Sequence, residues 1–418
     1  MLFKKITIVS LCIVLSLCTT ACRKTDGNLS SNYSNVSIVT DVYNEGEIDT
    51  GSENTTASEI TQGSEISNTS SDNTPSTKEE VTVNMKEKYG FNTLKSVEYY
   101  CVKDIPYGDA EYEITAILTD TGSNIGYMGD ISCKTKGVTV DGKKVTIPYD
   151  YKINNKSITL TATHRPSGVS IDFNITFDTW EMIFEDEFNG TELNTDVWNV
   201  WDSADWQYFY SPDSMFLDGN GHLINRVSIL ETPDSEFGYT RKSGAITTKD
   251  KYEHTYGYFE ISMKPHRTNG MMGAFWIMAG DMGDKDAAND NSSVNGAEID
   301  VVETLYNTKI PSHAVHWDGY TNTKSYGGTG KLQPIPEVFD GNFHTFAVRW
   351  TPDEYVFLVD GKVTARTEAE GGCNQPGYML ISTHFNEDWV GKVTMQPGEH
   401  TDMIVDYVRV YKNSSDPK

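Results

Sequence analysis

Alternation of apolar and polar residues, the pattern of half-buried β-strands, dominates the C-terminal half of the chain. No long stretch of residues 179–412 has the spacing of a helix. An Asp360-Gly361 pair, typical of tight hairpin turns, interrupts the longest strand-like stretch. The stretches are GHLINRVSIL, YGYFEISMKP, GAFWIMAG, AEIDVVET, SHAVHWDG, FHTFAVRWTPDEYVFLVDGKVTAR, GYMLISTH and MIVDYVRVYK. The pattern predicts an all-β domain of antiparallel strands, a two-sheet β-sandwich with one outer face free to form a groove.

Residues 81–178 have the same alternation in shorter strands. Hairpin signals occur at Asp141-Gly142 and at Pro166-Ser167-Gly168. About a hundred residues of this kind predict a small immunoglobulin-like β-sandwich domain. Such a domain is either a carbohydrate-binding module or a spacer. All eight tryptophans of the chain lie at or beyond Trp180, which leaves this region without the commonest flat platform for a sugar ring and favours a spacer.

The N-terminus has the pattern of an export signal. Lys4 and Lys5 precede an apolar run over residues 6–18 that is too short to span a bilayer. The following CTTAC resembles a bacterial lipoprotein box, which implies a signal peptide over residues 1–22 and lipidation of Cys22. Ordinary cleavage nearby and an uncleaved anchor are the alternatives. Each reading places the protein outside the cytoplasm, either as a membrane-anchored surface lipoprotein or in secreted form.

Residues 23–80 are rich in Ser, Thr, Asn, Gly and Glu and contain few aromatic residues. A segment of this composition buries too little apolar area to offset the entropy lost on ordering. It is expected to be a flexible tether between the anchor and the folded domains.

The balance of charge and the cysteine spacing exclude two classes of function. The net charge of −26 argues against nucleic acid or any strongly anionic polymer as a partner, since those need a basic surface. The six cysteines include no CxxC motif, which argues against a structural zinc site. Cys101 and Cys133 are candidates for a disulfide in an oxidising compartment. A neutral ligand fits the composition best.

The candidate chemistry lies in the stretch GAEIDVVET, which carries Glu298, Asp300 and Glu303. In a regular strand the first two share a face and Glu303 points the other way, among core side chains, at a cost of several kcal/mol. A β-bulge at Val301-Val302 would insert one residue and return Glu303 to the face of the other two. The spacing therefore predicts a bulge and a row of three carboxyl groups.

Three neighbouring carboxyl groups raise the proton affinity of at least one member. Retaining glycoside hydrolysis needs two carboxyl groups about 5–5.5 Å apart, one ionised as the nucleophile and one protonated as the acid. The alternative is a solvated acidic strand face without chemistry, which would be the better reading of an isolated ExDxxE motif.

The surrounding motifs resemble glycoside hydrolase family 16, in its bulged, laminarinase-like branch. The resemblance covers residues 179–412 and rests on motifs in the family's order, namely FEDEFNGTELNTDVW, SGAITT, YGYFEISMK, GAFWIM, EIDVVE, DGNFHTFAVRW, VDGK and DYVRVYK. It implies a jelly-roll sandwich of the concanavalin A-like type. It also implies that Glu298 is the nucleophile, Asp300 the assisting acid and Glu303 the general acid/base.

The same resemblance implies further binding residues. Trp276 matches the tryptophan that stacks on a sugar beside the scissile bond, with a buried core position as its alternative. His316 matches a histidine near the catalytic acids, with a purely structural histidine as its alternative, and Trp317 is expected to add a second stacking surface. No cofactor is required for catalysis. The family often carries a structural calcium ion, and Glu187 and Asp406 lie in motifs suitable for binding it. The alternative is that both are ordinary surface carboxylates.

Three positions depart from the laminarinase-like pattern. This chain has Ala245 where those members usually have Arg, Gly273 where they have Pro, and Val302 where they have Met. The missing Arg weakens the case for a β-1,3-glucan more than the case for the mechanism. We therefore expect a monomeric, retaining endo-β-glycanase acting on a neutral 1,3-linked or mixed-linkage β-glucan. The alternatives are a β-galactan hydrolase of the agarase or endo-β-galactosidase type, a transglycosylase, and, least favoured, a non-catalytic sugar-binding protein.

Overall fold

The computed structural model describes residues 77–79, 93–120, 123–126, 129–164, 170–280, 282, 292–318, 326–328, 333–369 and 371–417. All of them belong to one compact unit, Thr74–Lys418. The predicted signal peptide, its Cys22 and nearly all of the predicted tether lie outside the described residues. Within the described ranges, no helix is long and apolar enough to cross a membrane.

The region before residue 178 folds as two sheets around a small core of its own. One sheet contains β1 (Thr77–Glu79), β2 (Thr93–Lys103), β3 (Ala110–Asp120), β4 (Ser123–Gly126), β6 (Thr139–Asp141) and β7 (Lys144–Ile147). The other contains β5 (Gly129–Ser132), β8 (Ser157–His164) and β9 (Ser170–Thr176), and α2 (Tyr149–Asn154) follows β7. Ile114, Val145, Leu160 and Phe173 meet in the core, one from each of four strands. This is a small β-sandwich, and its assignment to the immunoglobulin class stays a prediction.

The predicted hairpin turn at Asp141-Gly142 falls where the sequence places it. β6 and β7 pair from Asp141 opposite Lys144, with Gly142 at a φ of 59°. Pro166-Ser167-Gly168 lies outside the described residues, but the flanking strands β8 and β9 are paired. Cys101 and Cys133 are free, so the candidate disulfide is absent.

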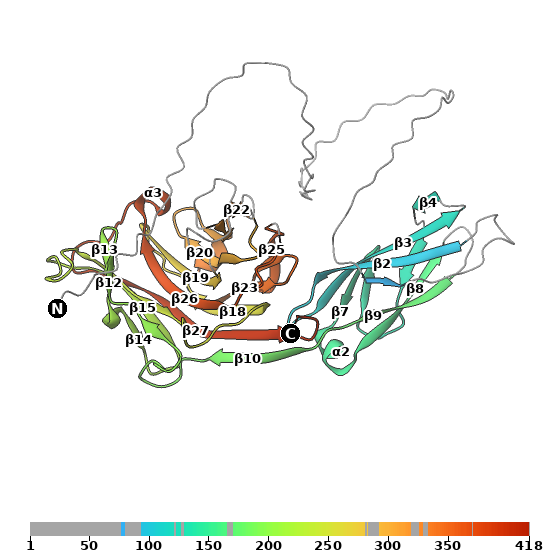
Figure 1. The fold of residues 1–418 in the computed structure, drawn as a ribbon, viewed down its shortest axis with the longest axis horizontal. Coiled ribbons are helices and arrows are strands. Elements are labelled where there is room, and N and C mark those ends of the chain that lie inside the picture. The colour runs from blue at the N-terminus through green and yellow to red at the C-terminus, as the bar shows by residue number, and fades with distance from the viewer. Residues whose placement is uncertain are drawn as a thin grey trace, which may run out of the picture. The chain divides into compact units, whose positions relative to one another are not determined.

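The C-terminal domain consists of two larger sheets, as the alternation predicts (Figure 1). The outer sheet has the order β12 (Ser203–Asp205), β13 (Tyr208–Tyr210), β16 (Arg241–Ser243), β15 (Leu223–Ile229), β27 (His400–Asn413), β18 (Gly257–Lys264), β23 (His344–Trp350), β24 (Tyr355–Val359) and β25 (Lys362–Thr367). β10 (Trp180–Asp186) pairs with β27, and β14 (Met215–Leu217) pairs with β15. The first and last strands of the domain are therefore neighbours. The Asp360-Gly361 turn joins β24 to β25, with both residues at positive φ.

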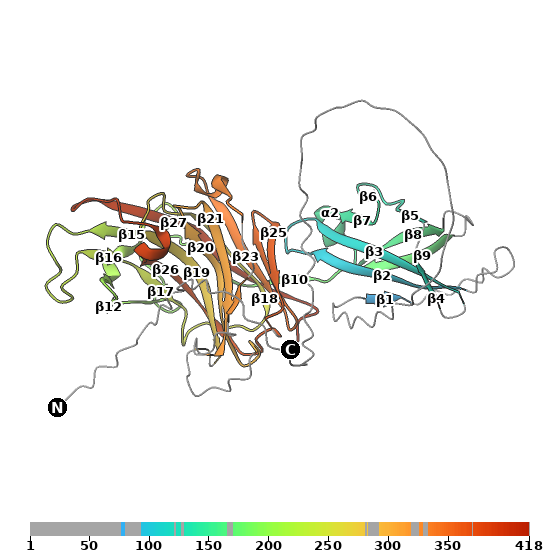
Figure 2. The ribbon, with the colours of Figure 1, turned by 90° about the horizontal axis from the view of Figure 1, so that it is seen from above.

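The inner sheet has the order β11 (Asn199–Val200), β17 (Ala245–Thr247), β26 (Gly377–Phe385), β19 (Met271–Gly280), β20 (Gly296–Leu305), β21 (Ile310–His316) and β22 (Tyr326–Gly328). Figure 2 shows the neighbours β19, β20 and β21 side by side. Within the described residues of this domain, the short helices are η1 (Pro212–Ser214), η3 (Pro336–Phe339) and α3 (Glu387–Val390). All paired strands of the domain run antiparallel except β13 and β16.

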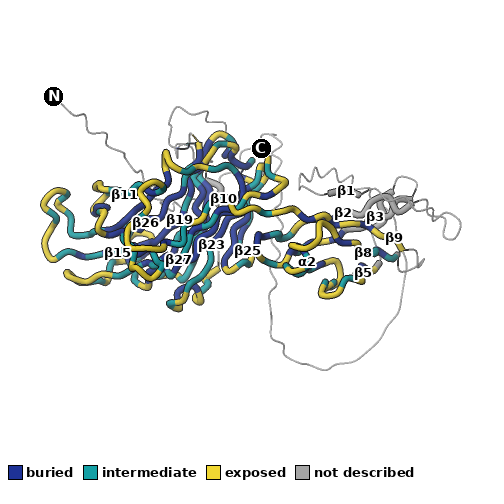
Figure 3. Tube along the Cα trace, turned by 90° about the horizontal axis from the view of Figure 1, so that it is seen from below, coloured by how far each residue is buried: buried dark blue, intermediate teal, exposed yellow. Residues whose placement is uncertain are grey.

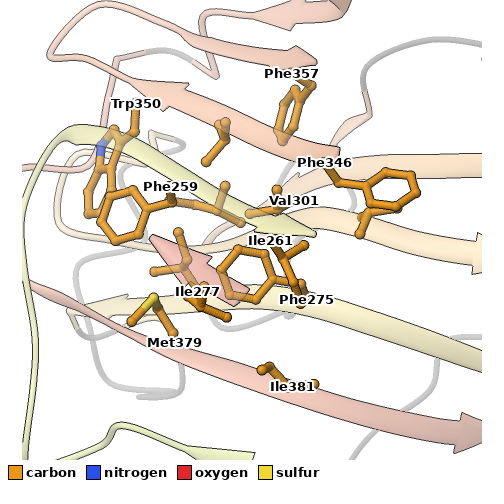
Figure 4. Packing of buried hydrophobic residues seen from close by; sticks show 14 of the residues in the cluster. Phe259, Ile261, Phe275, Ile277, Val301, Phe346, Trp350, Phe357, Met379 and Ile381 are labelled. Carbon is orange, nitrogen blue, oxygen red and sulfur yellow. The ribbon is translucent and has the colours of Figure 1, made fainter. Parts of the chain in front are cut away.

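The core lies between these two sheets. Phe275 and Ile277 of the inner sheet pack with Phe259, Ile261 and other outer-sheet residues in one cluster (Figure 4). The strands are buried along most of their length while the connecting turns are exposed (Figure 3). The inner sheet thus has one face in the core, and its other face carries the candidate site.

Candidate active site

The predicted bulge is present in β20. On the β19 side, Phe275 lies opposite Val302 and the next residue, Trp276, lies opposite Asp300, which leaves Val301 without a β19 partner. One extra residue in a strand of an antiparallel pair is the definition of a bulge. The structure therefore confirms the explanation offered for the spacing of the three acids.

The register shows that the three acids share one face. Glu298, Asp300 and Glu303 lie opposite Met278, Trp276 and Ala274 of β19, respectively. These partners are two residues apart, so their side chains all point to the same side of the sheet. Ile299, Val301 and Val302 are fully buried in the core. The bulge thus keeps the apolar residues inside and all three carboxyl groups outside.

Glu298 and Glu303, at the two ends of this row, lie far apart along the backbone, so only long side chains can bring their carboxyl groups close together. The β19 partners of Glu298 and Glu303 are four positions apart, which corresponds to about 13 Å between the Cα atoms of the two glutamates. Two glutamate side chains that lean over the shorter Asp300 can reduce this separation. Asp300 is 5% exposed, whereas both glutamates are only partly buried.

His313 on β21 holds the bulge and was not predicted. Its Nδ1–H donates to the carbonyl oxygen of Val301 at 2.5 Å, and its Nε2 lies 3.0 Å from Thr364 Oγ1. Its ring stacks on Phe357 with centroids 4.9 Å apart. Burial lowers the pKa of His313 to about 4, so the ring is neutral near pH 7. The carbonyl oxygen that the bulge removes from the ladder therefore has a dedicated partner.

The electrostatics separate the roles of the acids. Burial, and then the charges of Asp300 and Glu298, raise the pKa of Glu303 well above its usual value. His316 Nε2 lies 3.3 Å from Asp300 Oδ2. Burial alone would lower the pKa of His316, but the hydrogen bond to Asp300 and the charges of Asp300 and Glu298 outweigh it and raise this pKa. The site therefore combines a glutamate whose raised pKa favours its protonated form with an aspartate that lies beside a histidine.

Trp276 lies beside these groups with its orientation fixed. Its Nε1–H donates to Ser382 Oγ at 3.0 Å, and the residue is partly exposed. Phe275 and Ile277 on either side of it are fully buried, as alternation predicts for a tryptophan that faces the groove. The alternative of a core position for Trp276 does not hold.

The prediction for Trp317 is wrong. It is 4% exposed and belongs to the core cluster between the sheets. The neighbouring His316 faces the carboxyl groups, and successive residues of an extended chain point to opposite faces. A ring buried in the core offers no stacking surface to a sugar.

Each of the two residues suggested for calcium has a protein partner. Glu187 Oε1 accepts a hydrogen bond from Arg409 Nε at 2.7 Å, and Asp406 Oδ2 accepts one from Ser262 Oγ at 3.2 Å. The calcium site stays a prediction. Across the described part of the chain, the group of three side chains that could hold a cation is Glu298, Asp300 and His316, with ligand atoms within 4.8 Å of one another. These residues are two of the three acids and the histidine beside them.

Ala245, where laminarinase-like proteins usually carry Arg, is fully buried. It packs in a cluster with Tyr208, Tyr210 and Phe385. It lies opposite Ser382 on β26, in the same register row as Ala274 and Glu303. Aromatic residues therefore cover this position in place of a cationic side chain.

Comparison with known proteins agrees with this geometry. The family model described as "Beta-porphyranase A-D, GH16 domain" matches residues 180–413, more than half of the chain. Endo-1,3-1,4-beta-glycanase ExsH of Rhizobium meliloti is 27% identical over 265 residues, which cover 56% of this chain and 52% of that protein. Glucan endo-1,3-beta-glucosidase A1 of Niallia circulans is 26% identical over 266 residues, which cover 55% of this chain and 38% of that protein. The chain thus spans about half or less of the length of these curated relatives.

Among solved structures, the laminarinase catalytic domain of Thermotoga maritima superposes with a TM-score of 0.47 at 22% identity, covering 56% of this chain and 98% of that chain. The family match coincides with the domain that carries the bulged strand and the three acids. The chain belongs to glycoside hydrolase family 16.

Proposed function

We propose that this protein is a retaining endo-β-glycanase that hydrolyses a neutral β-glucan with 1,3 or mixed 1,3-1,4 linkages. The observation that carries the proposal is the bulge at Val301, which places Glu303 in one row with Glu298 and Asp300. The raised pKa of Glu303 supplies the protonated acid that this chemistry needs.

In the first step of this mechanism, a carboxylate oxygen of Glu298 attacks the anomeric carbon while Glu303 gives its proton to the departing glycosidic oxygen. The product of the step is a glycosyl ester on Glu298 and an ionised Glu303. In the second step Glu303 takes a proton from water, whose oxygen attacks the same carbon and releases Glu298. Asp300 lies between them beside His316, and its charge contributes to the raised pKa that favours the protonated form of Glu303.

The substrate class rests on the names of the relatives and on charge. The two curated relatives described above are named for 1,3- and 1,3-1,4-linked β-glycans. A net charge of −26 favours a neutral polysaccharide over an anionic one. The second candidate is a galactan of the porphyran type, because the matching family model is described as a β-porphyranase.

A substrate panel with product sizing tests both candidates. The panel contains laminarin, a mixed-linkage β-glucan, agarose and porphyran. We expect long oligosaccharides as first products from one of the glucans, and products longer than the substrate would indicate transglycosylation. Early release of monosaccharides alone would contradict endo action, and turnover of porphyran alone would replace the first candidate by the second.

We further propose that the mature protein is a monomer anchored to the outside of a bacterial membrane through a lipid on Cys22. The CTTAC motif and the polar tether that follows it support this location. The Cys22→Ala variant should remain unprocessed or leave the membrane fraction. A wild-type protein found entirely in the culture medium would favour simple secretion, and a dimer in size-exclusion chromatography would contradict the monomer.

A further inference from the structure

The tip of the hairpin between β12 and β13 carries an exposed tryptophan. Trp206 is 66% exposed, the largest value among the large hydrophobic residues that the structure describes as exposed. Asp205 pairs with Tyr208, so Trp206 and Gln207 alone make the turn. Gln207 has a φ of 67°, a left-handed conformation that residues other than glycine seldom adopt. Tight two-residue hairpin turns commonly need this conformation, so the turn itself accounts for it.

The second strand of this hairpin, β13, is buried, whereas Ser203 and Ala204 of β12 are exposed. Tyr208, Phe209 and Tyr210 are 3%, 3% and 1% exposed. Phe209 stacks on Phe237 with ring centroids 5.1 Å apart, and Tyr208 packs against Phe385 at 5.5 Å. The exposed Trp206 is therefore followed directly by a well-packed strand.

Hydrogen bonds connect the tip to the floor of the candidate site. Trp206 N–H donates to Asp205 Oδ1 at 2.6 Å, and Tyr208 OH donates to Asp205 Oδ2 at 2.7 Å. Tyr208 OH also lies 3.0 Å from His384 Nδ1. His384 Nε2 lies 2.8 Å from Ser382 Oγ, which accepts the Nε1–H of Trp276. The chain of contacts thus runs without interruption from Trp206 to Trp276.

One end of this chain has a fixed direction, because the indole Nε1–H of Trp276 can only donate to Ser382 Oγ. The Nδ1 atom of His384 lies within reach of two hydroxyl groups, Tyr208 OH at 3.0 Å and Tyr210 OH at 3.1 Å. Burial lowers the pKa of His384, which favours the neutral ring. A neutral imidazole has one donor and one acceptor nitrogen, so in either tautomer it can link the tyrosine pair to Ser382.

The same contacts place the hairpin on the carboxyl side of the inner sheet. His384 and Ser382 lie opposite Met272 and Ala274, whose side chains point to the same face as that of Trp276. Trp276 in turn lies opposite Asp300. The hairpin that carries the exposed indole is therefore anchored, through Tyr208 and His384, to the face of the sheet that holds the reacting groups, on the side where β26 and β17 lie.

We propose that Trp206 is a second sugar-stacking residue, which forms a remote subsite for a β-linked glycan chain whose reacting bond lies at Glu298 and Glu303. This proposal rests on the proposed function, which places the reacting bond of the glycan at Glu298 and Glu303. An indole offers an apolar surface with a polar edge, and the C–H face of a pyranose ring matches it.

Binding of oligosaccharides of increasing length tests this subsite. The parent protein is the full chain with Glu298→Gln, so that hydrolysis does not consume the ligand. Its affinity is measured by calorimetry for laminarin and mixed-linkage oligosaccharides and for agarose oligosaccharides. We expect Trp206→Ala to weaken binding roughly tenfold for long oligosaccharides, with a smaller loss as the chain becomes shorter. Trp206→Phe should retain most of the affinity because an aromatic face remains.

Met182→Ala is the matched control. Met182 is an apolar residue of β10 with 44% exposure, and it takes no part in the hydrogen-bonded chain. Its substitution should leave all affinities unchanged. Equal affinity of the Trp206→Ala variant and the parent, or an equal loss at every chain length, would overturn the subsite. Binding that depends on Trp206 in a protein whose wild type cleaves nothing would uphold the subsite and reject the hydrolase. A parent that binds no polysaccharide of the panel would overturn both.

Discussion

His313 donates its Nδ1–H to the carbonyl oxygen of Val301 across 2.5 Å, and this bond supports the bulge that brings Glu303 to the active face. The extra residue of a bulge leaves a backbone group outside the ladder, and a buried group without a partner is costly. A histidine that is 2% exposed and neutral supplies the missing donor from the neighbouring strand. The position of the proposed catalytic acid thus depends on a side chain that does not touch the substrate.

Replacing His313 by Phe tests this dependence. The substitution keeps a ring that can stack on Phe357 but leaves the Val301 carbonyl without its donor. We expect a loss of about 1–3 kcal/mol in the free energy of unfolding. We also expect a fall in kcat, because Glu303 loses its fixed position. Urea denaturation and steady-state kinetics provide the measurements. An unchanged unfolding free energy would show that the bulge does not need this bond.

Deleting Val302 tests the bulge itself. Because Val301 precedes it with the same side chain, the product carries a regular ExDxE sequence in which all three acids share a face without a bulge. We expect a folded protein that loses about 1–3 kcal/mol through repacking and the loss of one buried side chain, with residual hydrolysis.

Deletion of Ile261 is the control for this experiment. Ile261 lies in the middle of β18, a strand paired on both sides, where a missing residue turns every following side chain to the wrong face. This variant should misfold. Circular dichroism that shows both deletion variants equally unfolded would contradict the bulge as the explanation for the ExDxxE spacing.

The sequence was sufficient to predict the bulge because only one arrangement keeps Glu303 out of the core and Val301 and Val302 inside it. The alternating strands and the turn at Asp360-Gly361 were likewise local patterns, and the structure has them. His313 could not be found in this way, because its acceptor is a backbone carbonyl that becomes available only when the strands have paired. The same holds for His384, whose partner Tyr208 is 176 residues away in the chain.

The error at Trp317 has a different origin. A motif with adjacent histidine and tryptophan was interpreted as two groups lining one groove. Successive residues of an extended chain point to opposite sides, so a groove-facing His316 already implied a buried Trp317. The sequence likewise could not show that Arg409 pairs with the carboxylate of Glu187, because the two residues are far apart along the chain.

The pH dependence of hydrolysis should follow the proton on Glu303. Only the protonated acid can assist the leaving group, so kcat/KM should fall as pH rises through the pKa of Glu303. Since burial and the two neighbouring carboxylates raise this pKa, the fall should occur well above the range of an ordinary glutamate. Asp300→Asn removes one of the charges and should move the alkaline limb to lower pH. An unmoved or upward-shifted limb would show that Asp300 does not raise the pKa of Glu303.

Glu260, which lies in β18 of the outer sheet, should make the free energy of unfolding depend on pH. It is 1% exposed and accepts hydrogen bonds from Tyr258 and Tyr407, and burial raises its pKa from 4.5 to about 7. Between these values the unfolded chain loses the proton while the folded protein keeps it. The free energy of unfolding should therefore fall as pH rises from about 4.5 to about 7, by an amount on the order of 3 kcal/mol.

Glu260→Gln isolates this contribution from all other titrations. The variant should be more stable than the wild type at pH 8 and lose that advantage at pH 4, where the wild-type carboxyl group is protonated in both states. Urea denaturation at the two pH values gives the difference. Parallel stability curves for the two proteins would mean that Glu260 does not titrate on unfolding in this range.

The most direct test of the account is the release of an activated aryl leaving group by Glu298→Gln and Glu303→Gln in a single turnover. Such a leaving group needs no proton, so the Glu303 variant should still form the glycosyl ester and release one equivalent of aryl alcohol, followed by slow hydrolysis. The Glu298 variant has no nucleophile and should release none. A burst from the Glu298 variant, or equal bursts from both variants, would contradict the assignment of nucleophile and acid on which the proposed mechanism depends.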